Sequence, residues 1–213
     1  MTLESIETGC GGESETVRVG LSDGSLFTVK TCYIKIGGHC CDAADWIPGR
    51  EVSQAEADAL AFALICGRAE RAATRLVMRA EQYRLGLCIK LERRGFDSAC
   101  IKAVTEKLIE NDLLNDRRYA EMWLKVRVSK KTGKVSGPKE LRFVLQKKGI
   151  DREATSLALE KVLDEDAEYT LLERFLSKKS RKGNIYHEKA MLRAEGFSPD
   201  VINRYLDDNN NYS

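Results

Sequence analysis

Ten basic side chains lie between residues 125 and 152, where only Glu140 and Asp151 carry negative charge. Lysine and arginine neutralise phosphates without reading base sequence, and they also steer acidic protein partners. A solvated helix surface would explain any one of these residues, but the clustered excess favours a binding role. The ten are Lys125, Arg127, Lys130, Lys131, Lys134, Lys139, Arg142, Lys147, Lys148 and Arg152.

An aromatic residue, Phe143, stands among these charges. If Leu141 and Leu145 face inward, a helical step of about 100° per residue points Phe143 away from them, beside Arg142 and Lys147. There it could stack on a nucleic-acid base or fill a pocket of a protein partner. It could equally pack against a neighbouring part of the chain, and the sequence leaves both interpretations open.

The motifs of common enzymes are missing. The two histidines have no neighbours that mark a catalytic base, and Gly133-Lys134 lacks both the earlier glycine and the following hydroxyl residue of a phosphate-binding loop. No Gly-x-Gly-x-x-Gly, His-Glu-x-x-His or Gly-x-Ser-x-Gly occurs. We therefore expect no catalytic residues and no cofactor.

Cysteine usage and hydropathy indicate a cytoplasmic protein. The seven cysteines are an odd number without framework spacing, which favours reduced thiols. In the stretch from His39 to Asp42 the two cysteines are adjacent and cannot easily share one tetrahedral ion, so we expect no metal site. No apolar run approaches the roughly 20 residues of a membrane span, and the N-terminus does not look like a signal peptide.

One local pattern occurs three times: a Leu, three further residues, a Gly and a large apolar residue. A glycine just past a helix end can adopt the left-handed conformation, and the apolar residue then packs back on the Leu, as in a Schellman motif. A good N-cap residue (Asp97, Asp151 or Ser198) follows each copy. The three predicted corners are Leu91, Gly95, Phe96; Leu145, Gly149, Ile150; and Leu192, Gly196, Phe197.

The corners predict a mainly α-helical fold of three tandem three-helix repeats. Positions six and nine residues beyond each glycine match as well, and the helix before each corner completes a repeat. Ser53 and Glu56 fit a capping box at the first helix. In the second repeat, Asn115 or Asp116 can cap a helix whose face is Tyr119, Met122, Trp123 and Val126, and Pro138 suits the first position of the next helix. Such repeats stack into an elongated, curved array.

A small β unit precedes the repeats. Residues 1–14 read as a loose polar lead-in, residues 16–21 alternate like a strand, and Asp23-Gly24 is a hairpin signal before residues 26–36. Residues 1–66 hold ten Asp and Glu against four Lys and Arg, so this end is acidic and the remainder basic. We expect four parts: the acidic β unit at 1–50 and helical repeats at 51–112, 113–163 and 164–213. Our hypothesis is that the β unit docks on, or screens, the basic array.

Four stretches in order, "LCIKLERRGFD", "NDRRYAEMWLKVR", "GPKELRFVLQKKGID" and "MLRAEGFSPDVI", resemble the RecX family, regulatory proteins of the bacterial recombinase RecA. The resemblance covers about residues 55–208 and is best in the middle repeat. Tyr83 and Gly86 depart from it, because the family usually has a small polar and an acidic residue there.

The resemblance implies a non-catalytic regulator, most simply a negative modulator. It implies binding in the groove of the RecA filament on single-stranded DNA, where strand exchange, ATP hydrolysis and repressor co-cleavage are limited, and hence a role in DNA repair, homologous recombination and the SOS response. We expect a monomer whose partners are the filament and single-stranded DNA, with double-stranded DNA left open. The candidate contact residues are Arg127, Lys130, Lys131, Lys139, Arg142, Phe143, Lys147 and Lys148.

A second class of function stays open at this point: a free-standing helical DNA-binding protein, such as a transcription regulator that uses the corners as helix-turn-helix elements. The positions after the corners are poor in the Arg, Asn and Gln that read bases, which weighs against it. Sequence-selective binding to a duplex, unaffected by a recombinase, would favour it.

Overall fold

The computed structural model describes residues 1–8, 16–36, 39–40, 46–129, 134–179 and 185–210. They form two compact units, each with its own hydrophobic core. The first unit contains Met1–Ala80 and Leu87–Leu114, and the second contains Glu81–Gly86 and Asn115–Ser213. This grouping is coarser than the four-part division expected from the sequence, which stays a prediction.

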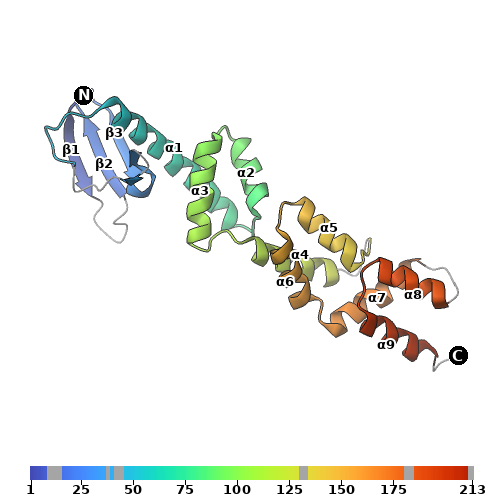
Figure 1. The fold of residues 1–213 in the computed structure, drawn as a ribbon. Helices are drawn as coiled ribbons and strands as arrows, with labels where there is room; N and C mark the ends of the chain where they lie inside the picture. The colour runs from blue at the N-terminus through green and yellow to red at the C-terminus, as the bar shows by residue number, and fades with distance from the viewer. Residues whose placement is uncertain (9–15, 37–38, 41–45, 130–133, 180–184, 211–213) are drawn as a thin grey trace. The chain divides into compact units, whose positions relative to one another are not determined.

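The first unit begins with a three-stranded antiparallel sheet in the order β1-β2-β3 (Figure 1). Val17, Val19 and Leu21 are buried, as the alternating pattern predicts for one face of β2. At the hairpin turn, Asp23 accepts a hydrogen bond from the Ser25 N–H at 2.9 Å. The elements are β1 (Leu3–Thr8), β2 (Thr16–Leu21), β3 (Leu26–Lys30), a 3-10 turn η1 (Thr31–Tyr33), β4 (Lys35–Ile36) and β5 (His39–Cys40).

Strand β1 corrects the expectation of a loose lead-in at residues 1–14. Leu3 pairs with Leu21, but the register shifts between Leu3 and Ser5. Because of this bulge, Leu3 and Ile6, three positions apart, both pack on the core. The period of two that identifies a strand in a sequence is therefore broken. Residues 9–14 of the expected lead-in lie outside the described residues.

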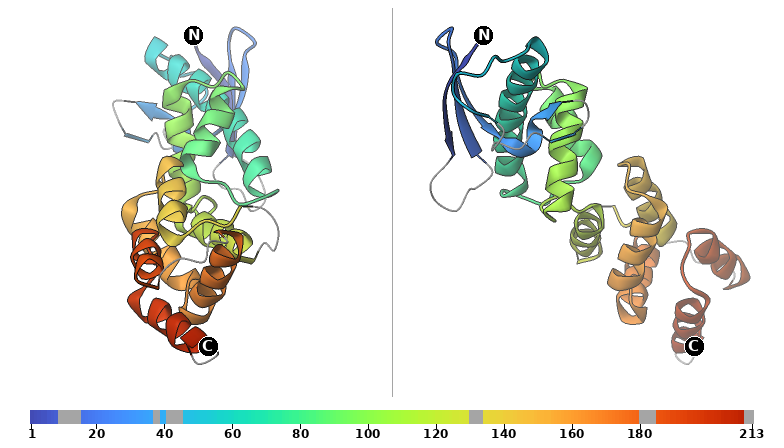
Figure 2. Two further views of the ribbon diagram at one scale, coloured as in Figure 1. Left: turned by 90° about the vertical axis from the view of Figure 1, so that its right-hand side faces the viewer. Right: turned by 60° about the vertical axis from the view of Figure 1, so that its left-hand side comes forward.

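The long helix α1 (Gln54–Val77) joins the sheet to the first repeat. Ser53 and Glu56 form the predicted capping box at its start. The helix lies beside β3, η1 and β4 on one side, and α3 (Ser98–Glu110) packs along it (Figures 1 and 2). Sheet and helices share one core, so the β unit packs directly on the first repeat. Between α1 and α3 comes α2 (Arg84–Glu92), whose first turn belongs to the second unit.

The second unit contains the other two repeats. In each repeat the first helix packs on the third: α1 on α3, α4 on α6 and α7 on α9. The fold is thus mainly helical, with nine described helices after a small antiparallel sheet, as predicted. None of the described helices is long and apolar enough to cross a membrane. The helices of this unit are α4 (Asp116–Ser129), α5 (Pro138–Lys147), α6 (Arg152–Val162), α7 (Glu165–Lys179), α8 (Ile185–Ala194) and α9 (Pro199–Asn210).

All three corners have Schellman geometry. The glycines have positive φ: 83° at Gly95, 82° at Gly149 and 91° at Gly196. In each corner the N–H of the apolar residue after the glycine donates to the carbonyl of the Leu five positions earlier, and the glycine N–H donates to the residue after that Leu. The next helix is then capped by the side chain of Asp97, Asp151 or Ser198. The local six-residue pattern therefore specifies the turn at each corner.

Helix α4 corrects a predicted face. Of the expected stripe, Met122 and Val126 are exposed, while Ala120 and Leu124 are fully buried. Glu121 is also buried, because Lys161 and Arg117 pair with its carboxylate at 2.6 and 3.2 Å. The buried side of α4 therefore includes a small residue, Ala120, and an ion-paired one, Glu121, and leaves two large apolar side chains exposed.

The sequence left Asn115 and Asp116 both open as the N-cap of α4, and the structure gives them different partners. Asn115 is the cap, since its side chain accepts from the Arg118 N–H at 3.0 Å. Asp116 instead accepts from the Arg84 N–H at 2.6 Å, at the start of α2. Burial raises the pKa of the Asp116 carboxyl above its usual value.

Candidate partner and nucleic-acid interface

The solvent-facing side of α5 carries most of the candidate contact residues. Pro138 starts the helix, and Leu141 and Leu145 bury the opposite side in the core of the second unit. With about 3.6 residues per turn, this arrangement turns Lys139, Arg142, Phe143 and Lys147 outward. Phe143 is 63% exposed, so its predicted direction away from the Leu side is confirmed. We call these four residues the α5 face.

The α5 face is positively charged and lacks internal neutralisation. Lys139, Arg142 and Lys147 are exposed, and none pairs with a carboxylate among the described residues. The one acidic residue of the helix, Glu140, is bound by Lys134 at 2.5 Å. This hydrogen bond from Lys134 holds the pKa of the Glu140 carboxyl below its usual value. An anion approaching α5 therefore meets cations that no carboxylate of the described ranges engages.

Helix α5 is held in place by the third corner. The Lys139 N–H donates to the Glu195 carbonyl at 2.9 Å. A Cβ on Gly137 would lie 2.9 Å from that same carbonyl oxygen, and one on Gly196 would lie 3.0 Å from the Lys139 nitrogen. Both glycines are required for this close approach, which fixes the base of the α5 face against the third repeat.

Phe143 also borders a shallow groove of about 460 Å³ between α5 and α8. Met191 and Ala194 supply apolar lining from α8, and Glu140 and Glu195 supply acidic lining. Phe143 thus adjoins the third repeat, yet most of its surface is exposed, and both sequence interpretations of this ring stay predictions. An exposed aromatic ring beside a recess and between cations is typical of a binding anchor.

Arg127 is a candidate contact residue outside the α5 face. Arg127, near the end of α4, is exposed and stacks over the Trp123 ring at 5.3 Å from its centroid. Lys130 and Lys131 lie outside the described residues.

Lys148 has a structural partner that the sequence did not indicate. Its ammonium lies 4.7 Å from the Tyr83 ring centroid and 5.8 Å from that of Tyr119. The two rings themselves pack at 4.9 Å between centroids. Tyr83 is distant in sequence from both, so only the fold could bring the three together. This cation–π cluster joins residues 81–86 to α4 and the second corner.

The described residues offer no group of three or more His, Cys, Asp or Glu placed to hold a metal ion. Cys66 and Cys100 are fully buried between α1 and α3. Burial raises the pKa of both thiols, so they are poor nucleophiles where they stand.

Comparison with known proteins decides the family. No protein-family model matches the chain. Among curated proteins, "Regulatory protein RecX" of Treponema pallidum (strain Nichols) is 33% identical over 150 residues, which cover 70% of this chain and 89% of the relative. This chain belongs to the RecX family. The RecX protein of Halorhodospira halophila is 42% identical over 71 residues, or 33% of this chain and 44% of that protein.

Solved RecX structures share the fold. One RecX crystal structure superimposes with a TM-score of 0.64 at 18% identity and covers 97% of this chain and 98% of its own, which speaks for the fold alone. The structure of RecX from Lactobacillus salivarius matches with a TM-score of 0.53 at 26% identity, over 68% of this chain and 96% of its own. The resemblance to RecX seen in the sequence is thereby confirmed. The relatives are named as regulatory proteins, in agreement with the expectation of a non-enzymatic regulator.

Proposed function

We propose that this protein is a negative regulator of a RecA-type recombinase. It binds along the groove of the recombinase filament on single-stranded DNA and limits ATP hydrolysis, strand exchange and co-protease activity. It acts as a monomer in the cytoplasm during DNA repair and the SOS response. Membership of the RecX family supports the choice of target.

The observation that carries the proposal is the α5 face. It combines three cations that pair with no carboxylate of the described residues with a 63% exposed aromatic ring, on a helix fixed at its base by the third corner. Rigid presentation lowers the entropy cost of binding, because the contact side chains sit on a helix and not on a loop. The cations suit the phosphates of DNA or an acidic protein surface, and Phe143 suits an apolar pocket between them.

Arg127 and Lys148 take different parts in this proposal. Arg127 is exposed and extends the positive surface along α4. The ammonium of Lys148 is engaged by two tyrosine rings, so its first effect is on the stability of the second unit. We therefore place the main contact on Lys139, Arg142, Phe143 and Lys147, with Lys130 and Lys131 as further candidates.

The test is the rate of ATP hydrolysis by the cognate recombinase on single-stranded DNA, titrated with wild-type protein and with Arg142→Glu/Lys147→Glu. We expect the wild type to lower the rate at substoichiometric amounts and the variant to lose at least tenfold in potency. The control is Arg93→Glu/Lys102→Glu, an equal charge change at two exposed residues of the first unit. An unaltered rate with wild-type protein that still binds DNA would favour a DNA-binding module. Equal loss in the control would mean that net charge alone matters.

A further inference from the structure

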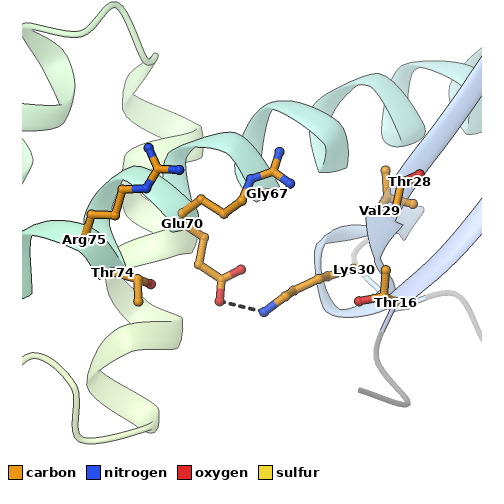
Figure 3. Close-up of a pocket in the computed structure, with 9 residues that line it drawn as sticks. Thr16, Thr28, Val29, Lys30, Gly67, Glu70, Thr74 and Arg75 are labelled. Carbon is orange, nitrogen blue, oxygen red and sulfur yellow. Dashed lines mark hydrogen bonds and ion pairs between the residues drawn. The ribbon is translucent and has the colours of Figure 1, made fainter. Parts of the chain in front are cut away.

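A second recess, whose lining is basic, lies in the first unit, away from the residues that the sequence singled out. It is a groove of about 520 Å³ between α1 and the strands β2 and β3. Figure 3 shows Lys30 of β3 reaching across the groove to Glu70 of α1; Thr28 also lines the groove from β3, and Thr74 and Arg75 line it from α1. All of its lining residues belong to the first unit.

The charge balance of this groove is positive. Glu70 is the carboxylate of the lining, and its Oε1 is bound by the Lys30 ammonium at 2.9 Å. Its other oxygen, Oε2, is buried and does not face solvent. Arg71 and Arg75 are exposed and make no ion pair with a carboxylate of the described residues. The lining therefore presents two guanidinium groups that no carboxylate of the described part of the chain offsets.

The arginines continue as a row on α1. Arg68, Arg71 and Arg75 are three and four residues apart, which places them on one side of the helix. All three are exposed. A row of this kind, running into a recess, can follow a chain of negative charges and not only a single anion.

Polar groups of the groove match phosphate oxygens. Thr16, Thr28 and Thr74 line it and supply hydroxyl donors. Gly67 stands in the lining with nothing within 4 Å of the place where a Cβ would be, so the helix surface is open there. Guanidinium groups bind phosphate with two parallel N–H···O bonds, which a lysine cannot reproduce.

We propose that this groove binds the phosphodiester backbone of single-stranded nucleic acid, as a site separate from the α5 face. A flexible single strand can bend its phosphates into a recess. A duplex is stiff over about 50 nm and would pass over the opening. Backbone binding of this kind reads no base sequence and weakens strongly with salt.

The test uses the full chain and a fluorescently labelled oligothymidylate, without recombinase, and measures anisotropy over a range of salt concentrations. The absence of recombinase keeps this test independent of the proposed function. Arg71→Glu/Arg75→Glu should weaken binding at least tenfold. It should also reduce the slope of log affinity against log salt by about 1.4, the loss of two phosphate contacts to a single strand.

Two further variants separate a groove from a general charge effect. Gly67→Leu fills the opening without altering any charge and should also weaken binding, while Arg93→Glu/Lys102→Glu, with the same charge change elsewhere in this unit, should bind nearly as the wild type does. Thermal unfolding of each variant verifies that the fold is kept.

Three outcomes would overturn the proposal. The first is oligothymidylate binding that Arg71→Glu/Arg75→Glu leaves unchanged, even if the variant binds an acidic protein partner less tightly. The second is an equal loss in the Arg93→Glu/Lys102→Glu control. The third is tighter binding to a duplex of the same length, which would assign the surface to double-stranded nucleic acid.

Discussion

The ring of Tyr83 occupies the space that a side chain on Gly86 would need. Three ring carbons lie 2.5 to 2.9 Å from the position of a Cβ on Gly86, far inside van der Waals contact. These two residues are the ones that depart from the usual RecX pattern in the first repeat. The structure relates the departures to each other: a large ring at position 83 requires a glycine at position 86.

The first prediction concerns this pair. Gly86→Ala should destabilise the second unit by about 1–3 kcal/mol, because the methyl group displaces Tyr83 from its contacts with Tyr119 and Lys148. In a Tyr83→Ser background the same change should be close to neutral or stabilising, since alanine favours a helix over glycine. Urea unfolding followed by Trp123 fluorescence, with Trp46→Phe as background, gives both values. Equal destabilisation in the two backgrounds would show that the ring and the glycine are not coupled.

The second prediction ranks two corner glycines of the second unit. Alanine at positive φ costs about 1–2 kcal/mol at either position. Gly149→Ala adds a contact of 3.1 Å with the Leu85 side chain, which can move. Gly196→Ala adds contacts of 3.0 and 3.4 Å with the backbone of Lys139, which cannot move without disturbing α5. We therefore expect the larger loss of unfolding free energy at Gly196, in the same Trp46→Phe background.

Gly95 supplies the matched control for this ranking. Its φ is 83°, but nothing lies within 4 Å of its Cβ position. Gly95→Ala should show the backbone cost alone, read from Trp46 in a Trp123→Phe background because Gly95 lies in the first unit. Equal losses at all three glycines would mean that the neighbouring contacts contribute nothing.

These comparisons show which features a sequence can predict. The corners were predictable, because seven consecutive residues determine the left-handed glycine, the apolar contact and the cap. Strand β1 was not predicted, because a bulge breaks the alternation of apolar and polar residues. The buried face of α4 was predicted wrongly, because Glu121 is buried through ion pairs with Arg117, one turn earlier, and with Lys161 of α6. The Tyr83–Lys148 contact and the groove between α1 and β3 join residues far apart in the chain. No local pattern predicts such contacts.

The third prediction is a pH dependence at Glu121. The hydrogen bond from Lys161, together with Arg117, holds the pKa of this carboxyl below its usual value of 4.5. A carboxyl with a lowered folded-state pKa stabilises the fold above its unfolded-state pKa and loses that contribution as the pH falls through the folded value. Glu121→Gln should therefore destabilise the second unit by about 1–2 kcal/mol at neutral pH. The difference in unfolding free energy between wild type and Glu121→Gln should disappear as the pH falls below 4.5.

Asp116→Asn should show a pH dependence of stability opposite in direction to that of Glu121→Gln. Burial raises the pKa of Asp116, so ionisation of this group opposes folding as the pH rises through its folded value. The stability gap between wild type and Asp116→Asn should therefore move with pH in the reverse direction to that of Glu121→Gln. Urea unfolding at a series of pH values measures both. A gap at Glu121 that stays constant from neutral pH to well below 4.5 would contradict the assigned ion pairs.

The fourth prediction separates stability from binding at Phe143. Because the ring is 63% exposed, Phe143→Ala should alter the free energy of unfolding by no more than about 0.5 kcal/mol. The same variant should lose at least tenfold in affinity for the recombinase filament on single-stranded DNA, since a central aromatic anchor contributes about 2 kcal/mol or more. Fluorescence titration against the filament measures the affinity. Met122→Ala, at an exposed apolar residue of α4, is the matched control. If Phe143→Ala unfolds more easily and binds as the wild type does, the ring serves packing against α8 and the α5 face loses its anchor.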